Sequence, residues 1–279
     1  SLSGGKMVRQ LTNRGEGPGE FRTSPSLTFL PGHIAASGDG KIILYQRDGK
    51  KIEEKRVPSN MRMFPVKSNY IGSRDVMDPK SKRFVRNNAI YNENFQKITD
   101  VNAFAPESMV VMGSNGKISR QNYYMIANGN GFITDGNHIC LYDSKKGFYI
   151  EIYNHEGKKI STLNINYKKI KVSGDYKTKR MADLKKNPSW DRLKKMFNFV
   201  FPDYFPAFRR VYVNRGLLYI VTDTPEENVQ ALSVLDFSGK ILAKSTMPKL
   251  YCRYFYKGSV YFFKESEDEK WVLHIHKLL

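Results

Sequence analysis

The chain has 279 residues, about two average domains in length, although some all-β folds of that length form a single domain. Its composition, with 40% hydrophobic and 26% charged residues, excludes disordered and collagen-like chains. No apolar run approaches the ~18 residues that cross a bilayer, so we expect no transmembrane segment. The net charge of +19 leaves two interpretations open: anionic partners, or a solvated lysine-rich surface.

A turn followed by Gly-Lys and an apolar strand recurs along the chain. Copies begin at Gly5, Gly49, Gly116, Gly157 and Gly239, and Phe95-Gln-Lys-Ile98 is a degenerate copy. Apolar or aromatic strands precede several copies, as at 41–45, 148–153 and 231–236. This pattern is typical of antiparallel hairpins, and a period of about 40–50 residues is the length of one β-propeller blade. The sequence therefore predicts an all-β propeller.

An insertion at 167–207 interrupts this pattern, because the interval between the Gly157 and Gly239 copies is too long for one blade. Between residues 168 and 195 it carries eleven Lys or Arg residues against three Asp residues. Such a stretch is either a solvated face or a dock for an anionic polymer, a membrane surface or an acidic protein. The candidate residues for an anionic partner are Lys177, Lys179, Arg180, Lys185, Lys186, Arg192, Lys194 and Lys195.

Two helices and an extended run are predicted within the insertion. Residues 176–186 read as a basic helix, and the Asn-Pro pair at 187–188 suits the start of a second helix. The apolar face of the second helix holds residues at spacings of three and four, namely Trp190, Leu193 and Phe197. The aromatic run 197–208 contains prolines, which favours an extended segment packed across the propeller.

The two ends of the chain complement each other. The last blade shows three strands, at 251–256, 259–264 and 271–278, and it lacks a fourth. Residues 6–11 form a strand that precedes every blade. We predict that this N-terminal strand completes the last blade and closes the ring, since closure removes an unpaired edge. The whole chain, 1–279, is then a single β-propeller domain with the insertion inside it.

The segment Arg14-Gly-Glu-Gly-Pro-Gly-Glu-Phe21 resembles the RGxGPGEF loop of the bacterial six-bladed, NHL-like β-propeller proteins. Many of these look like secreted proteins or lipoproteins of unknown function. Segments 203–240 and 252–278 look like the last two blades of that family. The resemblance implies six blades and an extracytoplasmic location, which is periplasmic, cell-surface or secreted. The strand repeats give five clear blades, since 105–130 matches no clean blade. We predict a six-bladed propeller, with five blades as the alternative.

The remaining motifs favour structural roles. No helical pattern follows the glycines at 15–19, so they suit a tight connection with φ > 0, with Phe21 plugged into a neighbouring sheet, rather than a phosphate cradle. His274 and His276 share one side of a strand, but no further metal ligands can be placed, so we predict neither metal nor cofactor. Cys140 and Cys252 lie in strand-like runs, which favours two buried thiols over a disulfide.

Ligands of propellers bind at the mouth of the central channel, toward which the first strands of the blades point. The candidate ligand-binding residues there are Arg209, Arg210, Tyr212, Tyr251, Arg253, Tyr254 and Asp135. No GxSxG motif and no Ser/His/Asp arrangement is present, so no catalytic residue is predicted.

We therefore expect a non-catalytic, monomeric, extracytoplasmic module that binds a ligand, a protein or an anionic polymer. Two alternatives stay open. A propeller-type hydrolase or lyase would need acidic and histidine residues clustered at the channel mouth. A binder of nucleic acid or another anionic polymer would need the basic residues to form one contiguous stripe. Nucleic acid is the less favoured polymer, because the family resemblance implies a location outside the cytoplasm.

Overall fold

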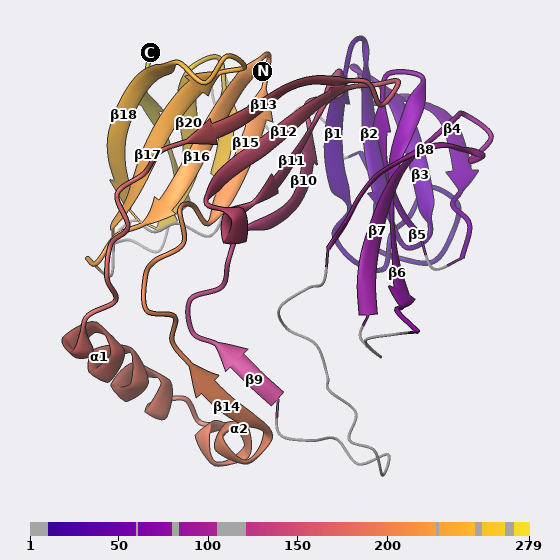
Figure 1. Cartoon of the computed structure of the whole chain (residues 1–279). Coiled ribbons are helices and arrows are strands. Elements are labelled where there is room, and N and C mark those ends of the chain that lie inside the picture. The colour runs from indigo at the N-terminus through magenta and orange to yellow at the C-terminus, as the bar shows by residue number, and fades with distance from the viewer. Residues whose placement is uncertain are drawn as a thin grey trace. The chain divides into compact units, whose positions relative to one another are not determined.

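The computed structural model describes residues 11–59, 61–79, 84–104, 121–226, 229–248, 253–265 and 271–279. These residues form five antiparallel sheets, which are the blades of a β-propeller (Figure 1). In each blade the strands lie side by side in chain order. Blade 1 consists of β1 (Ser26–Leu30), β2 (His33–Gly38), β3 (Lys41–Gln46) and β4 (Lys51–Arg56). Blade 2 consists of β5 (Met61–Val66), β6 (Asn69–Met77), β7 (Phe84–Tyr91) and β8 (Lys97–Phe104). Blade 3 consists of β10 (Asn130–Thr134), β11 (His138–Asp143), β12 (Phe148–Asn154) and β13 (Lys159–Ile165). Blade 4 consists of β15 (Arg210–Asn214), β16 (Leu217–Asp223), β17 (Val229–Asp236) and β18 (Ile241–Pro248). Blade 5 consists of β19 (Arg253–Tyr256), β20 (Ser259–Glu265) and β21 (Trp271–Lys277).

Contacts within the chain divide it into two compact units. The first unit contains blades 1 and 2 and the 134–139 and 153–160 segments of blade 3. The second unit contains the rest of blade 3, blades 4 and 5 and the insertion.

The Gly-Lys turns at Gly49, Gly157 and Gly239 join the third and fourth strands of their blades, and side-chain caps explain their sequence. The copies at Gly5 and Gly116 lie outside the described residues. The Oδ1 atom of Asp236 accepts hydrogen bonds from the backbone N–H groups of Ser238 and Lys240, and Gly239 has a φ of +88°. Asn154 caps the corresponding turn of blade 3 in the same way. In the degenerate copy Phe95 takes the glycine position with a φ of +60°, a conformation that costs an L-residue about 1–2 kcal/mol. The turn chemistry, more than the glycine itself, therefore defines the repeat.

Alternating side chains of the blades build the core. In the first unit, Ala35 and Ile42 of blade 1 pack with Met63 of blade 2, and all three are buried. In the second unit, Tyr219 of blade 4 stacks on Phe255 of blade 5 with ring centroids 4.7 Å apart. Each of these contacts joins neighbouring blades of one unit.

The five blades match the count that the strand repeats give. The described residues contain no sixth blade of the kind that the family resemblance implies. Of the stretch 105–130, which matches no clean blade, residues 105–120 lie outside the described residues. The three strands predicted for the last blade are present among the described residues, as β19, β20 and β21. The strand predicted at 6–11 lies outside the described residues except for Leu11, so closure of the ring stays a prediction.

The insertion forms two helices, α1 (Gly174–Lys185) and α2 (Trp190–Met196), followed by β14 (Phe197–Val200). The hydroxyl of Ser173 caps α1 by accepting a hydrogen bond from the backbone N–H of Tyr176. The predicted start of the second helix at 187–188 is wrong by two residues. The side chain of Asn187 accepts a hydrogen bond from the backbone N–H of Ser189 and closes a turn there, so α2 begins only at Trp190.

The aromatic run 197–208 has two structural parts. Its first four residues, β14, pair in parallel with β9 (Gln121–Tyr124), a partner that the sequence pattern did not predict (Figure 1). Its end packs against other segments of the second unit: Phe205 contacts Ile126, and Phe208 joins the core between blades 3 and 4. The prediction of an extended, packed segment holds for that end.

Candidate binding site

The RGxGPGEF loop lies on one face of blade 1, and its backbone forms a closed turn. The backbone N–H of Glu20 donates to the carbonyl of Gly17, and Gly19 has a φ of +79°. The loop delivers Phe21 into a pocket of blade 1, where the side chain is 2% exposed and contacts Ile43 and Tyr45. The structure thus confirms a tight connection with Phe21 plugged into the sheet.

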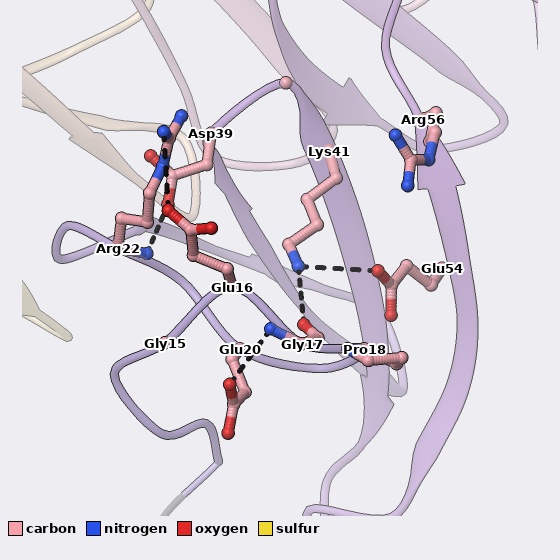
Figure 2. A pocket seen from close by; sticks show the side chains of 11 residues that line it. Gly15, Glu16, Gly17, Pro18, Glu20, Arg22, Asp39, Lys41, Glu54 and Arg56 are labelled. Atoms are coloured by element: carbon pink, nitrogen blue, oxygen red, sulfur yellow. Dashed lines mark hydrogen bonds and ion pairs between the residues drawn. The ribbon is translucent and has the colours of Figure 1, made fainter.

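Two charged side chains of blade 1 hold this loop in place (Figure 2). The Lys41 ammonium donates to the carbonyl of Gly17 at 3.2 Å and lies 3.5 Å from the Glu54 carboxylate. The other oxygen of Glu54 accepts hydrogen bonds from the backbone N–H of Gly19 at 2.9 Å and from Lys51 at 3.2 Å. Burial raises the pKa of Glu54, but these hydrogen bonds and the nearby ammonium groups outweigh it, so the pKa lies below its ordinary value.

A cavity of about 300 Å³ lies between the loop and blade 1 (Figure 2). Its charged lining residues are Glu16, Glu20, Arg22, Asp39, Lys41, Glu54 and Arg56. Most of these charges are already used: Asp39 accepts from the backbone N–H of Arg22, and Glu20 from that of Gly17. Because acidic and basic groups nearly balance, the cavity has little preference for an anion. The charged groups around the cavity mainly bind the backbone of the loop and hold it in place.

Three of the predicted channel-mouth residues come together at the start of β15. The Arg209 guanidinium donates to Asp223 at 3.0 Å, and the second Asp223 oxygen accepts from the Gln230 amide at 2.8 Å. A hydrogen bond with Tyr212 raises the pKa of the neighbouring Arg210. Tyr142 of blade 3 also acts on Arg210, and burial raises the pKa of the Tyr142 phenol to about 12. The structure therefore joins Arg209, Arg210 and Tyr212 in one polar cluster.

The other predicted ligand residues lie elsewhere. Tyr254 is exposed on β19 and stacks on Tyr256 with ring centroids 6.3 Å apart. Arg253 begins β19, while Tyr251 lies outside the described residues. The Asp135 carboxylate is only 2% exposed and accepts hydrogen bonds from the backbone N–H groups of Asn137 and His138, so it caps a turn. Asp135 therefore has a structural role in this turn, and its role in ligand binding stays a prediction.

The basic candidate residues of the insertion lie on α1 and α2, except Lys186, which is the C-cap residue directly after α1. Lys177 and Arg180 are half-buried, whereas the other candidates are exposed: Lys179, Lys185, Lys186, Arg192, Lys194 and Lys195. Two of the exposed cations form local ion pairs, Lys186 with Asp183 at 2.8 Å and Lys194 with Asp191 at 2.5 Å. The helices therefore carry more exposed positive charge than their acidic residues neutralise.

Sequence reasoning missed the acidic residues that position the charged groups. Asp223 and Gln230 face each other across β16 and β17, a register that sequence alone does not show. Glu54 lies on the outer strand of blade 1, opposite Ile43. A signal for Glu54 existed, since it is acidic in a strand that follows a Gly-Lys turn, but its partner in the loop is distant in sequence.

The residues that the structure describes contain no group of three or more His, Cys, Asp or Glu able to hold a metal ion. His274 lies on β21 and stacks on Phe262 with ring centroids 5.2 Å apart. Cys140 is a buried free thiol, and Cys252 lies outside the described residues. None of the described helices is long and apolar enough to cross a membrane.

Comparison with known proteins assigns no family to this chain. No family model matches the sequence, and no curated protein matches it. The β-propeller domain of the Trilobed protease from Pyrococcus furiosus is 12% identical, with 91% of this chain and 67% of that chain covered and a TM-score of 0.43. A crystal structure of the eukaryotic initiation factor is 8% identical, with 95% of this chain covered and a TM-score of 0.39. This chain spans 55% of the length of that initiation factor chain. The class is therefore defined by the blades themselves: a β-propeller with a basic helical insertion.

Proposed function

We propose that this chain is a non-catalytic binding module that docks an anionic partner through its basic insertion. One observation carries the proposal: Lys185, Arg192 and Lys195 are exposed and form no ion pair with any other described residue. A helix that only needs solubility can balance its charges by pairs three residues apart, as Lys194 and Asp191 do. These three cations are available to a partner.

The acidic groups near the cavity and the β15 cluster support a non-catalytic role. Asp39, Glu54 and Asp223 each accept at least two hydrogen bonds from protein groups. A general acid or base must instead exchange a proton with a substrate, and a carboxylate fixed by several donors is poorly suited to do so.

The test is binding of the full chain to anionic polymers at two salt concentrations. The panel contains single-stranded DNA and RNA, an acidic polysaccharide, anionic liposomes and a polyglutamate peptide. The test variant replaces Lys185, Arg192 and Lys195 by glutamine. Exposed ion pairs contribute about 0.5–1 kcal/mol each, so three of them predict a loss of roughly 10- to 100-fold in affinity.

A matched control removes the same charge from the blades. Lys50, Lys158 and Lys240 are exposed in the Gly-Lys turns, and their replacement by glutamine lowers the net charge equally. Salt-sensitive binding that the insertion variant loses and the control keeps supports the proposal. Equal loss in both variants, or no binding to any polymer, contradicts it, because the charge would then act only through the net total.

We also propose that the chain belongs to the NHL-like propellers and acts outside the cytoplasm. The support is the resemblance of segment 14–21 to the loop of that family, together with the propeller fold. Fractionation of cells that carry the natural full-length gene, followed by detection of this chain, tests the location. Recovery in the cytoplasmic fraction alone contradicts the proposed location.

A further inference from the structure

The outer edge of β9 in the two-stranded ribbon of β9 and β14 is unpaired within the part of the chain that the structure describes. Among the described residues, β9 pairs with β14 and with no other strand. Figure 1 shows α2 beside β14, at the opposite side of the ribbon from the outer edge of β9. Two strands of four residues each are short for a stable sheet, which normally needs a third strand or a packed helix.

One hydrogen bond fixes which backbone groups lie at that edge. The N–H of Met125 donates to the carbonyl of Val200 at 2.9 Å, and Val200 pairs with Tyr124 in the parallel register. In a parallel pair, alternate residues of a strand turn both their N–H and C=O groups toward the partner. Residues 123 and 125 therefore face β14, while the N–H and C=O groups of Asn122 and Tyr124 point outward, as in an edge that accepts another strand.

Aromatic side chains cover one face of the ribbon and extend to its edge. Phe197 and Phe199 pack on Tyr123 with ring centroids 5.6 Å and 5.8 Å apart, and Trp190 of α2 stacks on Phe199 at 5.3 Å. Tyr123 stays 49% exposed and Tyr124 36% exposed. These two side chains can contact alternate residues of an added strand on the two faces of the ribbon.

Positive charge lies on α2, which is separated from this edge by β14. Lys195 is two residues before β14, and Arg192 lies one turn earlier on the same short helix. A strand added to β9 would run about 10 Å from β14, because neighbouring strands are about 4.8 Å apart. The cations of α2 are therefore more than one Debye length of about 8 Å away at physiological salt, but well within the Debye length of about 30 Å at 0.01 M salt. An acidic strand at this edge would be attracted at low salt, and added salt would weaken the attraction.

We propose that an extended acidic peptide of a partner protein adds a third strand to the outer edge of β9. This inference rests on the proposed function, since the insertion supplies the charge that attracts the peptide. A peptide fits this edge better than a nucleic acid, because it supplies backbone N–H and C=O groups at the spacing that Asn122 and Tyr124 present.

The experiment selects peptides of about 12 residues, long enough for one strand, from a random display library on the full chain. The best peptide is synthesised in its natural form and in two N-methylated forms, each blocking one set of alternate amides. The proline variant Asn122→Pro removes one outward N–H without touching the pairing to β14, and Asn122→Ala is its matched control. A thymidine oligonucleotide and the Lys185, Arg192 and Lys195 variant complete the set.

The expected peptides are rich in Asp and Glu, and only one N-methylated register binds. Asn122→Pro lowers affinity ~10-fold, as expected for one or two lost hydrogen bonds, while Asn122→Ala stays near wild type. If both N-methylated peptides bind like the natural one, or if only the oligonucleotide binds, strand addition is wrong and anion docking survives. If neither peptide nor oligonucleotide binds and the charge variant changes nothing, both proposals fail. The peptide comparison uses unaltered protein, so it is independent of any effect of proline on folding.

Discussion

Replacing Phe21 by alanine tests whether the RGxGPGEF loop is part of the core of blade 1. The ring is 2% exposed, contacts Ile43 and Tyr45, and has the Lys41 ammonium 5.2 Å from its centroid. Truncation of a buried phenylalanine costs about 3–5 kcal/mol, and the lost cation–π contact falls within that range at about 0.5–1 kcal/mol. We therefore expect the free energy of unfolding to fall by about 3–5 kcal/mol.

The assay is urea unfolding followed by far-ultraviolet circular dichroism, with the slope of the transition compared between variants. Phe21→Leu keeps most of the apolar volume and should cost only about 1 kcal/mol. The control Leu27→Ala changes a side chain that is 48% exposed on β1, and should stay within about 0.5 kcal/mol of wild type. If Phe21→Ala were as mild as Leu27→Ala, the loop would lie on blade 1 without contributing to its core.

Three further predictions concern other parts of the chain. Two hydrogen bonds from Arg86, at 2.7 Å and 2.8 Å, hold the pKa of Asp75 below its ordinary value of 3.8. The stability that this pair contributes is present above pH 3.8 and lost as the pH falls through the lower folded pKa. Urea midpoints should therefore fall with acidification below about pH 4, and less steeply in Asp75→Asn; an unchanged slope contradicts this. Asp223→Ala should cost about 1–3 kcal/mol in thermal unfolding, because it leaves the Gln230 amide buried without its acceptor; a neutral result would mean that water replaces the carboxylate. Deletion of residues 1–10 should lower Tm if the N-terminal strand completes the last blade, and an unchanged Tm would refute closure.

The blades could be predicted from sequence because their signals are local. Alternating apolar residues and a capped turn lie within one hairpin, so the Asp236 to Lys240 segment carries its own structure. The degenerate copy at Phe95 was recognisable for the same reason, since Asn92 keeps the cap although the glycine is gone. Periodicity therefore located five blades without any knowledge of their packing.

The sites were predicted less well, because their partners are distant in sequence. Glu54 binds the backbone of Gly19, and Tyr123 pairs with Phe199 across a long stretch of chain. No periodic pattern relates such residues. Asp135 shows a local interaction that sequence reasoning overlooked: the backbone N–H groups of Asn137 and His138 donate to its carboxylate. A carboxylate in a turn usually accepts hydrogen bonds from the backbone N–H groups that follow it in the chain.

The local ion pairs of α2 give the last prediction. The Asp191 carboxylate lies 2.5 Å from the Lys194 ammonium group. This ion pair neutralises one solvent-exposed cation and lowers the net positive charge of α2. Asp191→Asn releases that ammonium group and adds one positive charge to the helix. If the insertion docks an anion, affinity for the polymer or acidic peptide should rise, by about 2- to 5-fold for one exposed pair. The rise should disappear at high salt, since the Debye length then falls to about 3 Å at 1 M.

A carboxylate on the blades gives the control: Asp100→Asn frees Lys97, which lies 2.9 Å away on β8, and should leave binding unchanged. Equal gains in the two variants would mean that net charge alone attracts the anion, and the insertion would lose its special role.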